Sequence, residues 1–173
     1  MDNDASHSPS YMLSLARTFA APIEEVFGAF TDPALLAQWW APRGYLTPIA
    51  NLDVRVGGEY RIGMHAEETP DELMFIHGTY REVNPPNRLV FTYVWEPDGA
   101  GARWVDMGVA DHVTLVIIEF HSLGASTRVK LEHDRFPNTE SRDAHIGGWT
   151  SCLDCFEDFL HQSNSSPKME ELP

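Results

Sequence analysis

The residues best suited to chemistry are two histidines that the chain brings close together. His133 and His145 are separated only by the short segment 134–144, so both could face the mouth of one cavity. Such a pair could form hydrogen bonds, supply half of a metal site or exchange protons. We favour a structural role, because a histidine that satisfies one buried carbonyl group is more common than a metal ligand.

Two cysteines have the spacing of a redox or metal motif. Cys152 and Cys155 form a Cys-x-x-Cys pair, and the chain has no other cysteine. A redox pair usually exposes one sulfur at a helix N-terminus, whereas these fall deep inside a predicted helix, with Cys152 on the side of Trp149. A zinc site would need further ligands. We therefore predict reduced cysteines that pack in the interior, with no metal and no cofactor.

The sequence lacks the motifs of nucleophilic catalysis and of phosphate binding. It contains no Gly-x-Ser-x-Gly elbow, no His-Glu-x-x-His and no phosphate loop. Gly57-Gly58 reads as a hairpin turn, and Gly99-Ala100-Gly101 is expected to lie in a loop with no helix behind it. We predict no catalytic residue and lean against an enzyme. The enzyme alternative is a cyclase or hydrolase with acid and base groups from His65, His133, His145 or Tyr93.

Hydrophobic patterning places these residues on a sheet and a long helix. Apolar side chains recur three and four residues apart from Thr139 to Leu160, which predicts an amphipathic helix with an N-cap at Pro137-Asn138-Thr139. β-Strands are predicted at 11–19, 46–54, 59–64, 73–83, 89–95, 113–120 and 127–133. Two short helices, 22–30 and 33–39, are predicted after the first strand.

This order of elements predicts an α+β fold. An antiparallel sheet of about seven strands that curls around the last helix would bury both apolar surfaces. In the strand 127–133 the alternation places His133 on the inward face with the apolar residues. The length and hydrophobic content fit one domain, which we place at 11–162. The polar segments 1–10 and 163–173 are predicted to be disordered tails.

Five segments, taken in order, resemble a known family. They are 17–33, 39–44 (Trp-Trp-Ala-Pro-Arg-Gly), 53–62, 78–91 and 145–153, which begins His-Ile-Gly-Gly-Trp. Over roughly residues 12–161 the chain resembles the START-like (SRPBCC) helix-grip superfamily, and within it the domain homologous to the activator of heat shock protein 90 ATPase. The resemblance implies a cavity between helix and sheet. That superfamily includes lipid carriers, hormone receptors, polyketide cyclases and co-chaperone domains.

Aromatic side chains that carry a polar atom mark a candidate pocket. Tyr60 shares its strand face with Met64, and Tyr93 shares one with Trp95, while Trp149 faces inward from the helix. Such a lining suits an amphipathic ligand, although ordinary core packing is an equal alternative. The family topology would add two tryptophans near one entrance. The predicted ligand-binding residues are Trp39, Trp40, Tyr60, Met64, Tyr93, Trp95, His133, His145 and Trp149.

Two loops are candidates for the rim of the pocket, and one strand is a candidate for contact with another molecule. The acidic segment 66–72 and the long segment 96–111, which carries Arg103 and Trp104, could form lids. Packing of Trp104 onto the sheet edge is an equal alternative. The strand Val113–Phe120 is apolar on both faces, and an exposed β-branched row of this kind usually meets another surface. It therefore predicts a possible homodimer contact.

The charge balance limits the classes of partner. The chain has 12 Lys and Arg against 26 Asp and Glu, a net charge of -14. Nucleic acids and anionic membranes attract basic surfaces, so we expect neither as a partner. The N-terminal sequence does not resemble a secretory signal, and no apolar run reaches membrane-spanning length. We therefore expect a cytoplasmic location.

The leading functional hypothesis is a protein that holds a small apolar or amphipathic molecule between helix and sheet. One alternative is the cavity-based enzyme described above. The other is a co-chaperone that regulates a heat-shock ATPase, which we consider less favoured because we expect a lone domain. An enzyme should show paired titrating groups in the pocket, a binding protein a cavity without them, and a co-chaperone an exposed patch.

Overall fold

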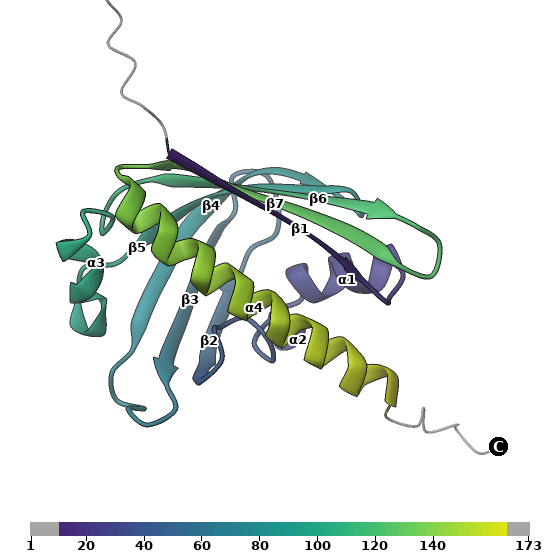
Figure 1. Cartoon of the computed structure of the whole chain (residues 1–173), viewed down its shortest axis with the longest axis horizontal. Helices are drawn as coiled ribbons and strands as arrows, with labels where there is room; N and C mark the ends of the chain where they lie inside the picture. The colour runs from purple at the N-terminus through teal and green to yellow at the C-terminus, as the bar shows by residue number, and fades with distance from the viewer. Residues whose placement is uncertain (1–10, 166–173) are drawn as a thin grey trace, which may run out of the picture.

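In the computed structural model, which describes residues 11–165, a curved antiparallel sheet wraps around a long C-terminal helix (Figure 1). The strands are β1 (Tyr11–Phe19), β2 (Tyr45–Leu52), β3 (Glu59–Ala66), β4 (Met74–Asn84), β5 (Arg88–Trp95), β6 (Thr114–Ser122) and β7 (Thr127–Phe136). Their order in the sheet is β1-β7-β6-β5-β4-β3-β2, and all neighbours are antiparallel. The α+β helix-grip fold predicted from the sequence is confirmed.

Side-chain caps fix where two of the helices begin. The helices are α1 (Ile23–Thr31), α2 (Pro33–Leu36), α3 (Ala102–Asp106) and α4 (Thr139–Ser165). The Asp32 carboxylate accepts hydrogen bonds from the backbone N–H groups of Ala34 and Leu35 at the start of α2. Asn138 does the same for the N–H of Ser141, 2.8 Å away, at the start of α4. Both residues satisfy N–H groups that have no partner within the helix.

The helices α2, α3 and α4 differ from the prediction by more than one residue. α3 starts directly after Gly101, in a segment predicted to hold no helix, and only Trp104 of its five residues is buried. A helix this short shows no apolar periodicity in the sequence. α2 ends at Leu36, before the predicted residue 39. α4 continues to Ser165, beyond the predicted start of the tail at residue 163. The remaining tail segments, 1–10 and 166–173, lie outside the described residues.

Phenylalanine side chains fill the end of the fold where α1 lies. The Phe30 ring of α1 contacts Phe120 of β6 and Phe156 of α4, each at a centroid distance of 5.2 Å. Phe19 of β1 meets Phe156 edge to face at 4.8 Å. These side chains are buried, as the sequence predicted for core residues. Close packing at the C-terminal half of α4 leaves space only beneath its N-terminal half.

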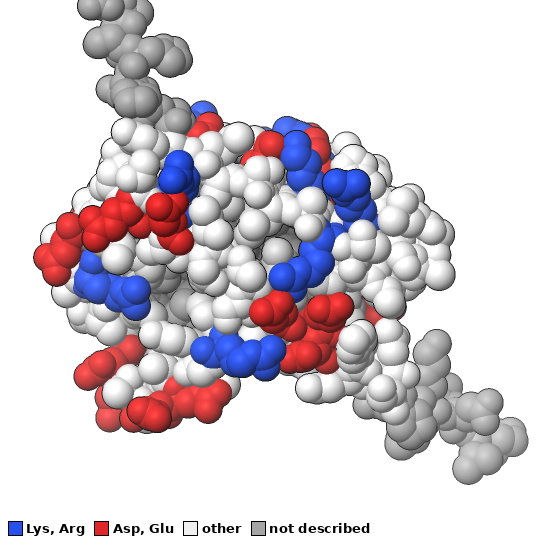
Figure 2. All heavy atoms as spheres, in the orientation of Figure 1, with Lys and Arg blue, Asp and Glu red and all other residues white. Residues whose placement is uncertain are grey.

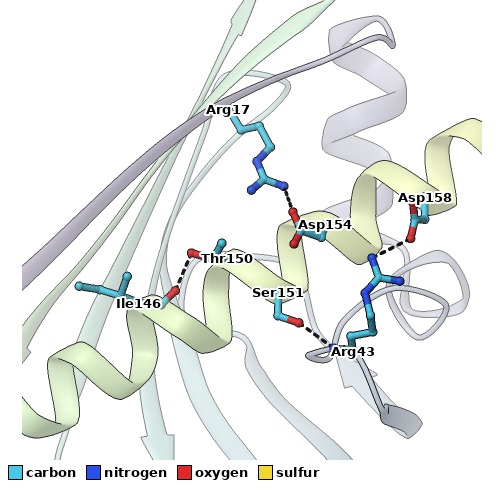
Figure 3. A network of polar contacts seen from close by, with 7 residues as sticks. All are labelled: Arg17, Arg43, Ile146, Thr150, Ser151, Asp154 and Asp158. Atoms are coloured by element: carbon cyan, nitrogen blue, oxygen red, sulfur yellow. Dashed lines mark hydrogen bonds and ion pairs between the residues drawn. The ribbon is translucent and has the colours of Figure 1, made fainter.

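The outer face of α4 is joined to the rest of the molecule by polar contacts (Figure 3). Arg17 of β1 lies 2.6 Å from Asp154, and Arg43 lies 3.0 Å from Asp158. The backbone N–H of Arg43 also donates to Ser151 Oγ, at 2.8 Å. Exposed ion pairs contribute only about 0 to 1 kcal/mol each, so these contacts mainly orient the helix and the segment before β2.

β6 has one buried and one partly exposed face. Its inward side chains are buried, as predicted: Thr114, Val116, Ile118 and Phe120. Leu115 and Ile117 are partly exposed on the opposite face, and Val113, just before the strand, is 50% exposed. β6 lies between β5 and β7 rather than at an edge. A homodimer through this strand would therefore use the outer face of the sheet.

Candidate functional site

A cavity of about 260 Å³ lies between the N-terminal half of α4 and the sheet. Its walls come from the segment before β2, from β3, β4 and β5, from α3 and from α4. The lining residues are Trp40, Ala41, Pro42, Tyr45, Met64, Met74, Tyr93, Trp95, Arg103, Trp104, Ala144, His145, Gly147, Gly148, Trp149 and Cys152. The wall is therefore largely aromatic and apolar, with few polar groups, which is typical of small-molecule sites.

The structure brings most of the predicted ligand-binding residues to this cavity. Those that line it are Trp40, Met64, Tyr93, Trp95, His145 and Trp149. Trp39, Tyr60 and His133 do not line it, contrary to the sequence-based expectation. Tyr60 donates from its hydroxyl to the Thr92 carbonyl at 2.7 Å, and Trp39 donates to the Ala29 carbonyl at 3.1 Å. Both are core residues whose polar atoms are satisfied by the backbone.

Each histidine of the predicted pair accepts a hydrogen bond from a tryptophan. Trp95 Nε1 donates to His145 Nε2 at 2.8 Å, and Trp149 Nε1 donates to His133 Nδ1 at 3.0 Å. An indole N–H is only a donor, so the accepting nitrogen must carry no proton. The network assigns the proton of His145 to Nδ1, which lies 2.6 Å from the Ser141 carbonyl.

Burial keeps both imidazoles neutral. It lowers the pKa of His145 to about 4, and it lowers the pKa of His133 well below its ordinary value. The second nitrogen of His133, Nε2, lies 2.7 Å from Thr114 Oγ1. Because all four ring nitrogens are hydrogen-bonded within the protein, neither histidine offers a free lone pair to the cavity. This geometry agrees with the structural role that the sequence favoured.

Three donor groups at the cavity have no acceptor among the described residues. The indole Nε1 of Trp104 is buried without a partner, although its ring stacks on Trp95 at a centroid distance of 4.3 Å. The hydroxyl of Tyr93 makes no hydrogen bond within residues 11–165, and burial raises the pKa of Tyr93 well above its ordinary value. Arg103 lies over the Trp104 ring at 4.6 Å and has no carboxylate partner in the described chain.

Two glycines in α4 form a feature of the cavity that the sequence reasoning missed. Gly147 and Gly148 line the cavity, and a Cβ added at either position would meet no atom within 4 Å. Glycine inside a helix costs about 1 kcal/mol relative to alanine, yet no neighbour here requires its small size. Gly148 is partly buried at the cavity wall, so its missing side chain leaves space there, whereas Gly147 is exposed to solvent. The sequence did carry a signal for this feature, namely two consecutive glycines within a predicted helix.

The cysteines are both free thiols. Cys152 is buried at the cavity wall, with Sγ 3.9 Å from the Trp39 carbonyl, and Cys155 is half-buried. Burial raises the pKa of Cys152 well above its ordinary value, so this sulfur is a neutral thiol. His65, another residue considered for acid-base chemistry, bonds through Nδ1 to the Ala66 carbonyl and lies outside the cavity. Within residues 11–165 no cluster of three potential metal ligands occurs.

The sequence profile described as Activator of Hsp90 ATPase homolog 1-like protein matches residues 20–161. The chain belongs to this family. The five segments that suggested the resemblance lie almost entirely within that match, and membership indicates a ligand-binding or regulatory role. Among curated proteins, none matches the sequence.

Solved structures with the same fold come from several bacteria. The AHSA1 protein from Silicibacter pomeroyi is 26% identical, with a TM-score of 0.73 over 88% of this chain and 99% of that chain. A protein from Nitrosomonas europaea is 24% identical, with a TM-score of 0.70 over 90% and 97%. One from Chromobacterium violaceum is also 24% identical, with a TM-score of 0.72 over 85% and 94%. These likenesses show the fold.

The face on which α4 lies mixes charges of both signs (Figure 2). Acidic and basic side chains lie close together there, and this face carries no broad basic patch of the kind that binds a phosphate backbone. None of the helices in the described part of the chain is long and apolar enough to cross a membrane.

Proposed function

We propose that this protein binds a small, partly apolar molecule in the cavity between α4 and the sheet. The observation that carries the proposal is the cavity of about 260 Å³ itself, whose wall is largely aromatic and apolar and includes Gly148, a partly buried helix position with open space around it. An apolar cavity of about 150 Å³ accommodates benzene, so a space of about 260 Å³ suits a ligand of about ten to fifteen non-hydrogen atoms.

The polar groups of the cavity support binding rather than catalysis. General acid-base chemistry needs a titrating group with a free nitrogen or oxygen near the reacting atom. Both nitrogens of His145 are engaged, by Trp95 and by the Ser141 carbonyl. Tyr93 contributes a hydroxyl whose raised pKa suits hydrogen bonding better than proton transfer at neutral pH. The titrating group at the wall that interacts with it, the buried Cys152 thiol, is held neutral because burial raises its pKa.

The cellular setting and the assembly state belong to the same proposal. We place the protein in the cytoplasm, where a reducing environment would keep Cys152 and Cys155 as thiols. A homodimer would use the outer face of β6, where Leu115 and Ile117 are partly exposed beside Val113. Light scattering of wild type and of Val113→Lys would test the contact, since a buried lysine would disrupt it.

Native mass spectrometry of the protein, purified gently from its own host, tests the proposed binding function. We expect a co-purified small molecule on the wild type and its loss in Gly148→Leu, because the new side chain would occupy the cavity. Gly28→Leu is the matched control, since Gly28 lies in α1, away from the cavity, and also has open space around it. A ligand retained equally by Gly148→Leu would overturn the proposed site.

A further inference from the structure

From the charges and donors at the cavity wall, we infer that the ligand is an aromatic carboxylate whose anionic group pairs with Arg103. This inference rests on the proposed binding function and names the chemical class of the ligand. The relevant juxtaposition is a single cation on α3 at the edge of a largely aromatic cavity to which the described residues contribute no other charge.

The first argument is the sign of the charge. Among residues 11–165, Arg103 is the only charged residue that lines the cavity, and no Asp or Glu of this part of the chain lines it. This is notable in a chain with 26 acidic and 12 basic residues. Several arginines of the described chain meet carboxylates, as Arg61 does with Glu96 at 2.8 Å and Arg88 with Glu119 at 2.5 Å. Arg103 has no such partner among the described residues and is free to pair with an anion.

The second argument is the balance of donors and acceptors. The Arg103 guanidinium can only donate hydrogen bonds, and the Tyr93 hydroxyl has no hydrogen-bond partner within residues 11–165. His145, the remaining polar ring at the wall, has no nitrogen free to accept. A ligand must therefore bring the acceptors. A carboxylate does so with two oxygens, which match the planar fork of an arginine.

The third argument concerns the body of the ligand. Indole rings of Trp40, Trp95 and Trp149 line the cavity, and Trp40 meets Trp149 edge to face at a centroid distance of 5.2 Å. Flexible Met64 and Met74 side chains complete the wall from β3 and β4. Aromatic faces and thioethers attract a flat aromatic group, for which ring-ring contacts add to simple area burial.

The test compares two probes that differ mainly in charge, 2-naphthoate and 2-naphthamide, by isothermal titration calorimetry. For the wild type we expect the carboxylate to bind about tenfold more tightly than the amide, the effect of one charge-assisted hydrogen bond. Arg103→Gln should remove this preference while the amide affinity is unchanged, and Arg103→Lys should restore part of it. Added salt should reduce the preference, because Arg103 is exposed to solvent.

Arg81→Gln is the matched control, since Arg81 is an exposed arginine of β4 outside the cavity and its loss changes the net charge equally. It should keep the preference for the carboxylate. Thermal unfolding of every variant confirms that it is folded. Equal affinity of the wild type for both probes, or a preference retained by Arg103→Gln, would overturn the inference and leave the binding function standing. Binding of neither probe would also overturn the inference, whereas the binding function is decided separately by the co-purified molecule in native mass spectrometry.

Discussion

The Trp149 indole nitrogen on α4 donates a hydrogen bond to Nδ1 of His133 on β7, 3.0 Å away. The chain of bonds continues from His133 Nε2 to Thr114 Oγ1 and from that hydroxyl to the Tyr93 carbonyl, each at 2.7 Å. All four residues are buried. Since one helix residue is thereby linked to β7, β6 and β5, this chain fixes how α4 lies across the sheet.

Loss of the Trp149 donor should destabilise the fold even when the ring volume is largely kept. Trp149→Phe leaves Nδ1 of His133 buried without a partner, which typically costs about 1 to 3 kcal/mol of unfolding free energy. Trp149→Ala also removes the packing and should cost about 3 to 5 kcal/mol. Urea unfolding measures both. Trp104→Phe is the control, because its indole nitrogen has no partner to lose. A Trp149→Phe variant as stable as Trp104→Phe would contradict this account.

The protein should lose stability as the pH falls from about 6.5 to about 4. His145 is neutral in the fold, with its pKa lowered to about 4, so the unfolded chain takes up the proton first and stability rises with pH across this window. Across this window the lowered pKa of His145 alone changes the unfolding free energy by about 3 kcal/mol. The lowered pKa of His133 acts in the same direction.

Urea unfolding at several pH values measures this dependence. His145→Gln should make it less steep over the same window, because only one of the two buried histidines then contributes. His161→Gln, an exposed position near the end of α4, should leave it unchanged. An unfolding free energy that stays constant between pH 6.5 and 4.5 in the wild type would rule out the lowered pKa.

Alanine in place of either helix glycine should stabilise the protein. At Gly147 and Gly148 a Cβ meets no neighbour, so the gain in helix propensity is about 0.5 to 1 kcal/mol of unfolding free energy. At Gly78 in β4 the same change should destabilise, since its Cβ would lie 1.9 Å from the Thr92 carbonyl oxygen. Thermal melts of the three variants test this. No gain at either helix position would mean that the glycines have a packing role.

The two thiols should react at very different rates. Cys155 is half-buried and accessible, whereas burial at the cavity wall holds Cys152 as a neutral thiol. Titration with Ellman's reagent should therefore show one reactive thiol in the native protein and two after unfolding. Cys155→Ser should abolish the native signal, and elemental analysis should find no zinc. A native protein without any titratable thiol would instead indicate a disulfide.

The strands, the long helix and the inward face of His133 could be predicted because each depends on local periodicity. Apolar residues at helical spacing in α4 and alternation in β7 reflect which side chains avoid water, and this requires no knowledge of distant segments. Short elements were predicted less well. α3 buries only Trp104, which stacks on Trp95, so its sequence shows no periodicity.

The cavity itself was decided only by the tertiary structure. The sequence identified Trp95, Trp149, His133 and His145 as polar-tipped rings in the interior, but it could not show which indole nitrogen faces which imidazole. That pairing joins residues 50 and 16 positions apart along the chain. It leaves the histidines without a free nitrogen, and the packing of α3 places Arg103 as the only charged side chain of the described residues at the cavity. Periodicity tells whether a side chain is buried, whereas its partner depends on how the elements are packed.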